Sequence, residues 1–319
     1  ALFPEWLRFL KGVVDSSDLP LNVSREVMQD SELLRKLNQV LTKRFLRFLN
    51  EQSKKEPETY LEFWKEFGIL IKEGAATDFT YKDDLAKLLR FESTAMEPGK
   101  LTGLDEYIDR MAKDQKEILF LFGKSRQSIE AGPYLEALKA RSLEVLLLTE
   151  PVDEYVMQSV REYKEKKIIS ADSDELKLEK LDQEPEGKAL NKKDTKSLCK
   201  WLKESLKEKV SEVETGDRLI DSPVCIVGGD GLGGASARRV MKMMQGADDG
   251  MPTSPVKLQV NQRHPIIKGL SKLIESDKET AELIANQLLD NALATANLLD
   301  DPREMIARSY KAIEKLANQ

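Results

Sequence analysis

The sequence predicts a helix-rich protein of the α/β and α+β classes. Three observations support this class. Apolar residues recur with helical spacing through the first third of the chain, and short apolar runs alternate with helical segments from 104 to 171. In the last part, strand-like pieces are followed by three helices with clear start signals. The 319 residues are enough for roughly two or three domains with a sizeable core.

The composition is that of a soluble helical protein, with 40% hydrophobic, 33% charged and 6% aromatic residues. Basic and acidic residues number 50 and 56, and the net charge is -6. Because no region is strongly basic, we expect no nucleic-acid partner. No apolar run reaches the roughly 18 residues that a membrane-spanning helix needs. We therefore expect no membrane insertion, and no signal peptide is visible.

The cysteines and the histidine limit the chemistry that the chain can perform. Cys199 and Cys225 do not form a C-x-x-C pair, which excludes a disulfide framework or a zinc site and fits a reducing compartment. His264 is the single histidine of the chain, so multi-histidine metal sites are excluded. We expect no metal site, and we interpret His264, just before Pro265, as a helix cap or packed side chain.

The first third of the chain is predicted to be mainly helical. Residues 6–14 are strand-like and apolar, and a turn follows them. A long helical region is predicted from about 24 to 90, and the polar stretch 52–58, which contains Pro57, separates its two apolar stripes. The stripes consist of Leu33, Leu34, Leu37, Val40, Leu41, Phe45, Phe48 and Leu49, and then of Tyr60, Phe63, Trp64, Phe67 and Leu70.

The middle part is predicted to form a parallel sheet. Strands are expected at 118–122, 145–148 and 167–170, with helices near 133–140 and 152–163 between them. Strands that alternate with helices indicate βαβ units. The charged stretch 172–192 has almost no periodicity, and we interpret it as a domain boundary.

The last part is predicted to be α+β. A helix is expected around Cys199, followed by strands at 222–227 and 256–260. Three helices close the chain. They open at His264-Pro265, at Ser276 with Glu279 in a capping box, and at Asp301-Pro302 with Glu304 placed to close the cap.

The last two helices carry apolar stripes that would pair across a two-fold axis into a four-helix bundle. We therefore expect a homodimer through the C-terminal helices. The stripes consist of Ala281, Ile284, Leu288, Ala292, Ala296 and Leu299, and then of Met305, Ile306, Tyr310, Ile313 and Leu316.

The segment Gly229–Gly234 fits the pattern G-x-G-x-x-G after a strand, which raises the possibility of a dinucleotide-binding enzyme. Such a site also needs an acidic residue at the end of the next strand. Here that strand ends at Asn261, and no further βαβ unit follows. We therefore favour a flexible loop that leads into an amphipathic helix.

Two further segments leave alternatives open at the level of residue chemistry. Val240, Met243 and Met244 are either core residues or an adaptable binding surface, because flexible methionines serve both purposes. Arg25 lies at a helix start, where its guanidinium would be placed to bind a phosphate. Alternatively, Ser24 is a plain N-cap and Arg25 is an exposed side chain.

Several stretches together resemble the heat-shock protein 90 family. Residues 18–26 (DLPLNVSRE) resemble the catalytic-loop segment of its middle domain, and residues 88–93 (LLRFES) and 104–111 (LDEYIDRM) resemble segments that follow it. Residues 145–155 (VLLLTEPVDEY) resemble its strand-turn-helix, and residues 261–266 (NQRHPI) its C-terminal signature. The matches follow the family's order along nearly the whole chain. Two segments look most like the mitochondrial paralogue.

The resemblance implies a division into parts of two domains. Residues 1–19 would end the large αβα unit of the middle domain, with the catalytic loop following. Residues 20–103 would be its helical connector and 104–172 its small αβα unit. Residues 173–192 would be a linker and 193–319 an α+β dimerisation domain. On this basis we expect a fragment that lacks the N-terminal ATP-binding domain.

The resemblance also implies the function of an ATP-dependent chaperone that folds client proteins. Arg25 matches the arginine that contacts the ATP γ-phosphate, with Asn22 and Gln29 as loop neighbours. The helix around Met243 and Met244 matches the amphipathic client-contacting segment, and we expect Leu232, Val240, Met243 and Met244 to form the client-binding surface. The cofactors would be ATP with Mg in the full-length protein and none in this fragment, which would not be an ATPase by itself.

The mitochondrial matrix is favoured as the location, and another organelle or the bacterial cytoplasm remains possible. Two alternatives stay open beside the chaperone. One is the dinucleotide-binding enzyme, and the other is a purely structural helical scaffold that dimerises without protecting clients.

Overall fold

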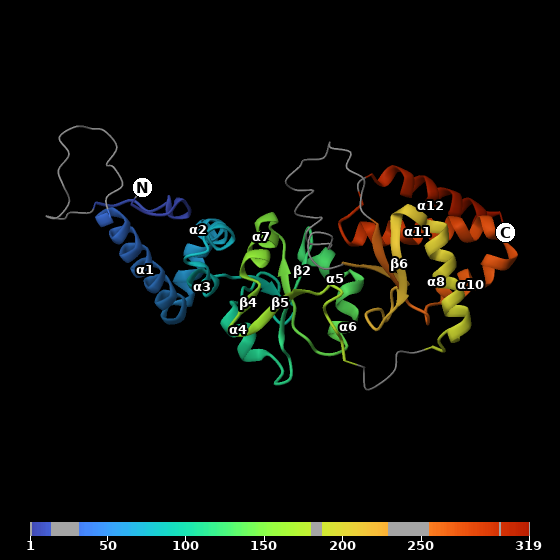
Figure 1. Ribbon diagram of the computed structural model, residues 1–319, viewed down its shortest axis with the longest axis horizontal. Coiled ribbons are helices and arrows are strands. Elements are labelled where there is room, and N and C mark those ends of the chain that lie inside the picture. The colour runs from blue at the N-terminus through green and yellow to red at the C-terminus, as the bar shows by residue number, and fades with distance from the viewer. Residues whose placement is uncertain (1, 14–31, 180–186, 229–254, 300, 319) are drawn as a thin grey trace.

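The molecule extends along one axis, with helices at its N-terminal end, a mixed sheet in the middle and a second helix-and-sheet unit at its C-terminal end (Figure 1). This computed structural model describes residues 2–13, 32–179, 187–228, 255–299 and 301–318. The mixed α/β and α+β class predicted from the sequence is confirmed.

At the N-terminal end, the described residues 2–13 and 32–86 contain the helical elements η1 (Glu5–Leu7), α1 (Glu32–Lys55), α2 (Pro57–Thr77) and α3 (Lys82–Ala86). Pro57 stands at the first turn of α2, as expected for the residue that divides the two stripes. The strand predicted for 6–14 is wrong within the described residues, where Trp6 and Leu7 lie in a short 3-10 helix. Tertiary packing overrides the local apolar pattern, because the Trp6 indole is buried and donates to Asp78 Oδ2 over 3.0 Å.

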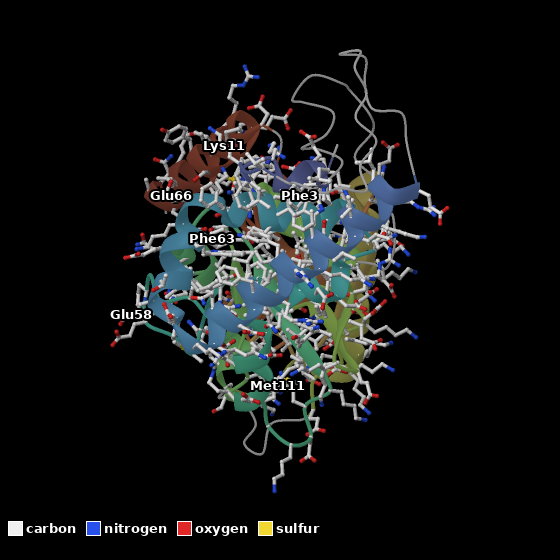
Figure 2. All side chains as sticks on the ribbon, turned by 90° about the vertical axis from the view of Figure 1, so that its left-hand side faces the viewer. Phe3, Lys11, Glu58, Phe63, Glu66 and Met111 are labelled. Carbon is white, nitrogen blue, oxygen red and sulfur yellow. The ribbon has the colours of Figure 1, made fainter. Side chains whose placement is uncertain are left out.

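Aromatic side chains join this N-terminal segment to α1 and α2. The ring of Phe9 stacks on Phe67 at 4.5 Å between centroids and lies 5.8 Å from Phe63 and 6.1 Å from Phe45. Figure 2 shows this end of the molecule, with Phe63 on α2. The described N-terminal segment therefore packs on α1 and α2.

The middle of the molecule is a five-stranded sheet in the order β1-β3-β2-β5-β4. Its three central strands are parallel, as predicted, and its two short edge strands are antiparallel and were not predicted. The strands are β1 (Glu92–Ser93), β2 (Glu117–Phe122), β3 (Leu146–Leu148), β4 (Glu162–Tyr163) and β5 (Lys166–Ser170). The helices are α4 (Leu104–Arg110), α5 (Arg126–Glu130), η2 (Pro133–Leu135), α6 (Glu136–Lys139) and α7 (Pro151–Val160).

The two faces of this sheet belong to different hydrophobic cores. On β3, Leu146 packs with α2, α3 and α7, whereas Leu147 belongs to the cluster that reaches the C-terminal helices. On β2, Phe120 belongs to the same cluster as Leu146, and Leu121 belongs to the same cluster as Leu147. Successive strand residues point to opposite faces, so one sheet is packed on both sides.

The C-terminal unit contains a three-stranded sheet in the order β6-β8-β7, with helices against it. The predicted strands β7 and β8 are confirmed, whereas β6 was missed because only its first residue is fully buried. The elements are α8 (Lys192–Leu206), η3 (Lys207–Lys209), β6 (Val210–Thr215), β7 (Val224–Val227), β8 (Val256–Val260), α10 (Pro265–Ser276), α11 (Lys278–Thr295) and α12 (Pro302–Ala317).

The helix starts predicted for this unit are confirmed at two of three positions. His264 and Asp301 are the N-caps of α10 and α12, each followed by proline. The cap predicted at Ser276 is wrong, because Asp277 caps α11 and accepts a hydrogen bond from the Thr280 amide. Glu304 pairs with Arg308 instead of closing the cap.

Candidate functional site

The predicted site residues fall outside the part of the chain that the structure describes. This holds for both predicted sites and for the glycine-rich segment. The residues are Asn22, Arg25 and Gln29, then Leu232, Val240, Met243 and Met244, and Gly229–Gly234. Their predicted roles therefore remain predictions.

The described surface carries one continuous apolar stripe on a long helix, on α12. Ile306, Tyr310, Ile313 and Leu316 are 44%, 68%, 56% and 71% exposed. Their spacing of four, three and three residues places them on one face of the helix. In Figure 1, α12 lies at the outer edge of the C-terminal unit, away from the middle sheet.

Polar side chains hold α12 on α11 with the stripe facing outward. Arg308 Nε donates to Asp290 Oδ2 over 2.7 Å, and Asp290 is only 3% exposed. Lys315 Nζ donates to the Thr280 hydroxyl over 3.0 Å. Sequence reasoning missed Arg308 and Asp290. A lone aspartate among the apolar residues of α11 was the available signal, since a buried carboxylate needs a partner.

The stripe predicted on α11 is used within the chain itself. Ala281, Leu288, Ala292 and Ala296 are buried in the core of the C-terminal unit. The two predicted stripes therefore differ. The one on α11 contributes to the fold, whereas the one on α12 is available to a partner.

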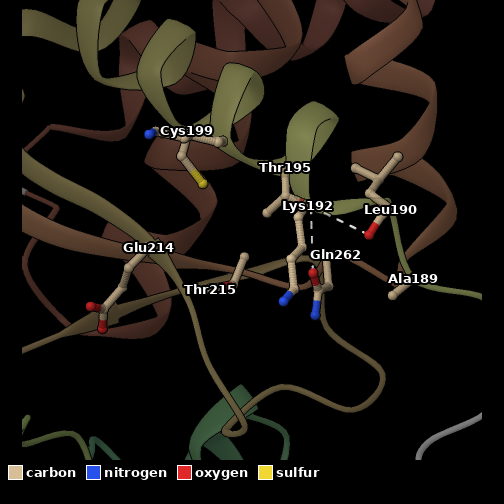
Figure 3. Close-up of a pocket in the computed structure, with 9 residues that line it drawn as sticks. Ala189, Leu190, Lys192, Thr195, Cys199, Glu214, Thr215 and Gln262 are labelled. Carbon is tan, nitrogen blue, oxygen red and sulfur yellow. Dashed lines mark hydrogen bonds between the residues drawn. The ribbon is translucent and has the colours of Figure 1, made fainter.

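A hollow of about 650 Å³ lies at the start of α8 (Figure 3). Thr195 reaches toward Leu190 and Gln262, and Cys199 lies one turn further along the helix. Burial raises the pKa of the Cys199 thiol, with Glu214 adding to the effect, so the nucleophilic thiolate is disfavoured. The described residues also contain no group of three or more metal-ligating side chains.

The His264 side chain serves the fold. Its Nδ1 accepts a hydrogen bond from the Ile266 amide over 3.1 Å, so that lone pair is engaged at the start of α10. Burial lowers the pKa of the imidazole, although Glu136 and Asp221 oppose the shift. A neutral capping histidine fits the interpretation made from the sequence.

The described helices include none that is both long and apolar enough to cross a membrane.

Comparison with known proteins gives matches along the whole chain. A sequence model of the Hsp90 protein family matches residues 1–319. The chain is 41% identical over 324 residues to chaperone protein HtpG of Desulfotalea psychrophila, covering 100% of this chain and 52% of the relative. It is 45% identical over 315 residues to HtpG of Desulfitobacterium hafniense, covering 98% and 51%. Its identity to the mitochondrial heat shock protein 75 kDa of Bos taurus is 39% over 324 residues, covering 98% and 46%. The chain thus spans about half the length of these relatives.

Proposed function

The chain belongs to the Hsp90 family, and we propose that it supplies the client-binding and dimerisation part of an ATP-dependent chaperone. The names of its relatives, chaperone protein HtpG and heat shock protein 75 kDa, support a chaperone role. Bacterial and mitochondrial relatives both match, so the mitochondrial matrix stays a prediction beside the bacterial cytoplasm.

The apolar stripe of α12 is the observation that supports dimerisation best. A stripe of four large side chains on water-exposed helix surface is unfavourable unless a partner covers it. A second copy of α12 offers the same stripe, and an isologous two-fold contact would bury both. The proposed homodimer therefore joins two chains through α12.

Light scattering tests this dimer directly. The wild-type chain should give about twice its 36.2 kDa mass. Ile313→Glu should shift it to the monomer mass, because a carboxylate in the stripe would be buried without a counter-charge. Lys311→Glu places the same carboxylate on α12 outside the stripe and should remain dimeric. A wild-type monomer at micromolar concentration, or a dimeric Ile313→Glu variant with unchanged affinity, contradicts the proposal.

ATP hydrolysis would belong to the longer protein. We propose that Arg25, with Asn22 and Gln29 beside it, contacts the γ-phosphate of ATP bound with Mg on another domain. A guanidinium supplied from outside the nucleotide pocket stabilises the charge that develops during phosphoryl transfer. This chain alone would not hydrolyse ATP.

Client binding is proposed for Leu232, Val240, Met243 and Met244. Flexible, polarisable methionines suit a surface that accepts many partners. In the double variant Met243→Ser with Met244→Ser, the melting temperature should barely change while suppression of client aggregation falls. Loss of about 2–5 kcal/mol of unfolding free energy would show instead that the methionines are core residues. Unchanged client protection would also reject the proposal.

A further inference from the structure

A carboxylate of the small αβα unit is held by the main chain of the C-terminal unit. Glu136, the first residue of α6, accepts hydrogen bonds from three consecutive amides at 220–222. The N···O distances are 2.8 Å from Ile220, 2.8 Å from Asp221 and 3.1 Å from Ser222. The Ser222 hydroxyl also donates to this carboxylate. Four donors from one short segment thus converge on a single anion.

The amide segment 220–222 is shaped by its own unit. Asn261 Nδ2 donates to the carbonyls of Ile220, over 2.9 Å, and Ser222, over 3.2 Å. The carbonyls are therefore drawn toward Asn261 while the amides face Glu136. Consecutive amides that point to one side form a concave site for an anion. Here the anion is a side chain of the neighbouring unit, and hydrogen bonds to a charged acceptor are the stronger kind.

A second contact joins the same two units close by. The Arg218 guanidinium, which is 7% exposed, donates from Nη1 to the Ala171 carbonyl over 2.6 Å and from Nη2 to the Leu176 carbonyl over 2.7 Å. Gly228 pairs with the same stretch, since its amide donates to the Asp172 carbonyl over 2.7 Å. Arg218 is buried and satisfied by carbonyls, whereas Glu136 is only half-buried, so water reaches the Glu136 contact more easily.

We propose that the Glu136 contact is a reversible lock that fixes the orientation of the small αβα unit relative to the C-terminal unit. The buried Arg218 contact, together with the apolar cluster that both units share, would act as the pivot that stays closed when Glu136 is released. Hydrogen bonds to a charged acceptor are strong enough to favour one orientation, and the half-exposed Glu136 carboxylate leaves them open to competition from water. This inference does not depend on the proposed function.

The test measures the distance distribution between two spin labels. One label replaces Glu162 on β4 and the other replaces Lys278 on α11, and Cys199→Ser removes the half-buried thiol. The labelled chain is mixed with an excess of unlabelled chain, so that each dimer holds one labelled copy. We expect a narrow distribution for the otherwise unaltered chain and a broad one for Glu136→Ala and Glu136→Gln. Glu130→Ala is the matched control, because the Glu130 carboxylate pairs with Arg126 inside the small unit.

Added acetate then shows whether a broad distance distribution in Glu136→Ala results from the missing carboxylate or from lost side-chain packing. Added acetate should narrow the distribution of Glu136→Ala by occupying the amide site at 220–222, whereas chloride at the same ionic strength should not. Acetate should narrow the distribution of Glu136→Gln less than that of Glu136→Ala, because the uncharged glutamine side chain keeps most of the volume of glutamate and leaves little room for acetate beside the amides. A narrow distribution in Glu136→Ala overturns the proposal even if the melting temperature falls, because Glu136 would then only stabilise the fold. A broad distribution that acetate leaves unchanged overturns it as well.

Discussion

Lys72 is a buried cation that connects two parts of the molecule. It is 4% exposed on α2, and its Nζ lies 2.7 Å from Asp153 Oδ1 and 3.1 Å from Glu150 Oε2 on the α7 side. The ammonium also lies over the ring of Phe91, 5.2 Å from its centroid. Burial raises the pKa of the Asp153 carboxyl, while the charge of Lys72 opposes that shift. Removing one partner of such a pair costs far more than the pair itself contributes.

This pair also shows what sequence reasoning cannot supply at the residue scale. From the sequence, Lys72 is expected to be one of many solvent-exposed charged residues on an amphipathic helix. Its partners Glu150 and Asp153 are 78 and 81 residues away in the chain. Contacts such as Lys72–Asp153, Arg308–Asp290 and Glu136 with 220–222 depend on tertiary placement. A local charge pattern does not encode that placement.

At the same scale, Arg25→Ala tests the proposed γ-phosphate contact in the longer protein. ATP hydrolysis should slow by roughly a factor of 10³ or more, on the scale of other arginine contacts to a transferring phosphate. Nucleotide affinity should remain largely unchanged, because the contact belongs to the reacting state. Arg25→Lys should restore little activity, since lysine lacks the planar fork of donors. Steady-state kinetics and nucleotide titration measure both quantities, and hydrolysis at the wild-type rate would reject this role.

At the scale of elements, helix starts were the most predictable features. Pro57, Pro265 and Pro302 stand at or near the start of α2, α10 and α12, because proline fits where the amide has no partner in the helix. Short edge strands were the least predictable. β1 and β4 have two residues each, which is too few to show an alternation.

The caps of α11 and α12 lead to a pH prediction. Hydrogen bonds from the Thr280 hydroxyl and amide lower the pKa of Asp277, and those from the Arg303 side chain and amide lower the pKa of Asp301. A carboxyl whose pKa is lower in the folded state binds fewer protons there than in the unfolded chain. It therefore stabilises the fold above the ordinary pKa of 3.8, and this stabilisation is lost as the pH falls through the lowered value.

Asp301→Asn should isolate this effect, because asparagine retains a capping oxygen without the charge. The wild-type chain should be the more stable one at neutral pH, and its advantage should disappear as the solution is acidified below the ordinary pKa. Denaturant midpoints measured for both chains across the pH range give the difference. Asp109→Asn makes the same chemical change at an exposed aspartate that caps no helix, and it serves as the control. If the difference in unfolding free energy between the wild-type and Asp301→Asn chains did not change with pH, the Asp301 cap would not contribute to the loss of stability in acid.

At the scale of the whole molecule, one sheet connects the two ends. Its parallel centre was predictable because strands and helices alternate from 117 to 170. The separation of two hydrophobic cores by this sheet was not predictable. Strands that are buried on both faces have continuous apolar sequences, which do not show which residue points to which face. Residues 145–148 are all apolar, so the sequence predicts that they are buried but not which face of the sheet each one occupies. The boundary predicted at 173–192 stays a prediction, although the buried cluster on one side of the sheet extends past it to α11.

Neighbouring leucines on β3 offer a matched test of this division. Leu146 and Leu147 are 0% and 2% exposed. Leu146 belongs to the cluster with α2, α3 and α7, and Leu147 belongs to the cluster that reaches the C-terminal unit. Each change to alanine should cost about 2–5 kcal/mol of unfolding free energy, since both leave a cavity in a packed core. Amide hydrogen exchange should separate them, because local openings follow the contacts that are lost. Leu146→Ala should accelerate exchange in α2 and α7, whereas Leu147→Ala should accelerate it in β7 and α11. If both variants accelerated exchange equally in α2, α7, β7 and α11, the prediction would be wrong. The loss of packing on either face of the sheet would then destabilise the whole molecule, and the two cores would unfold together.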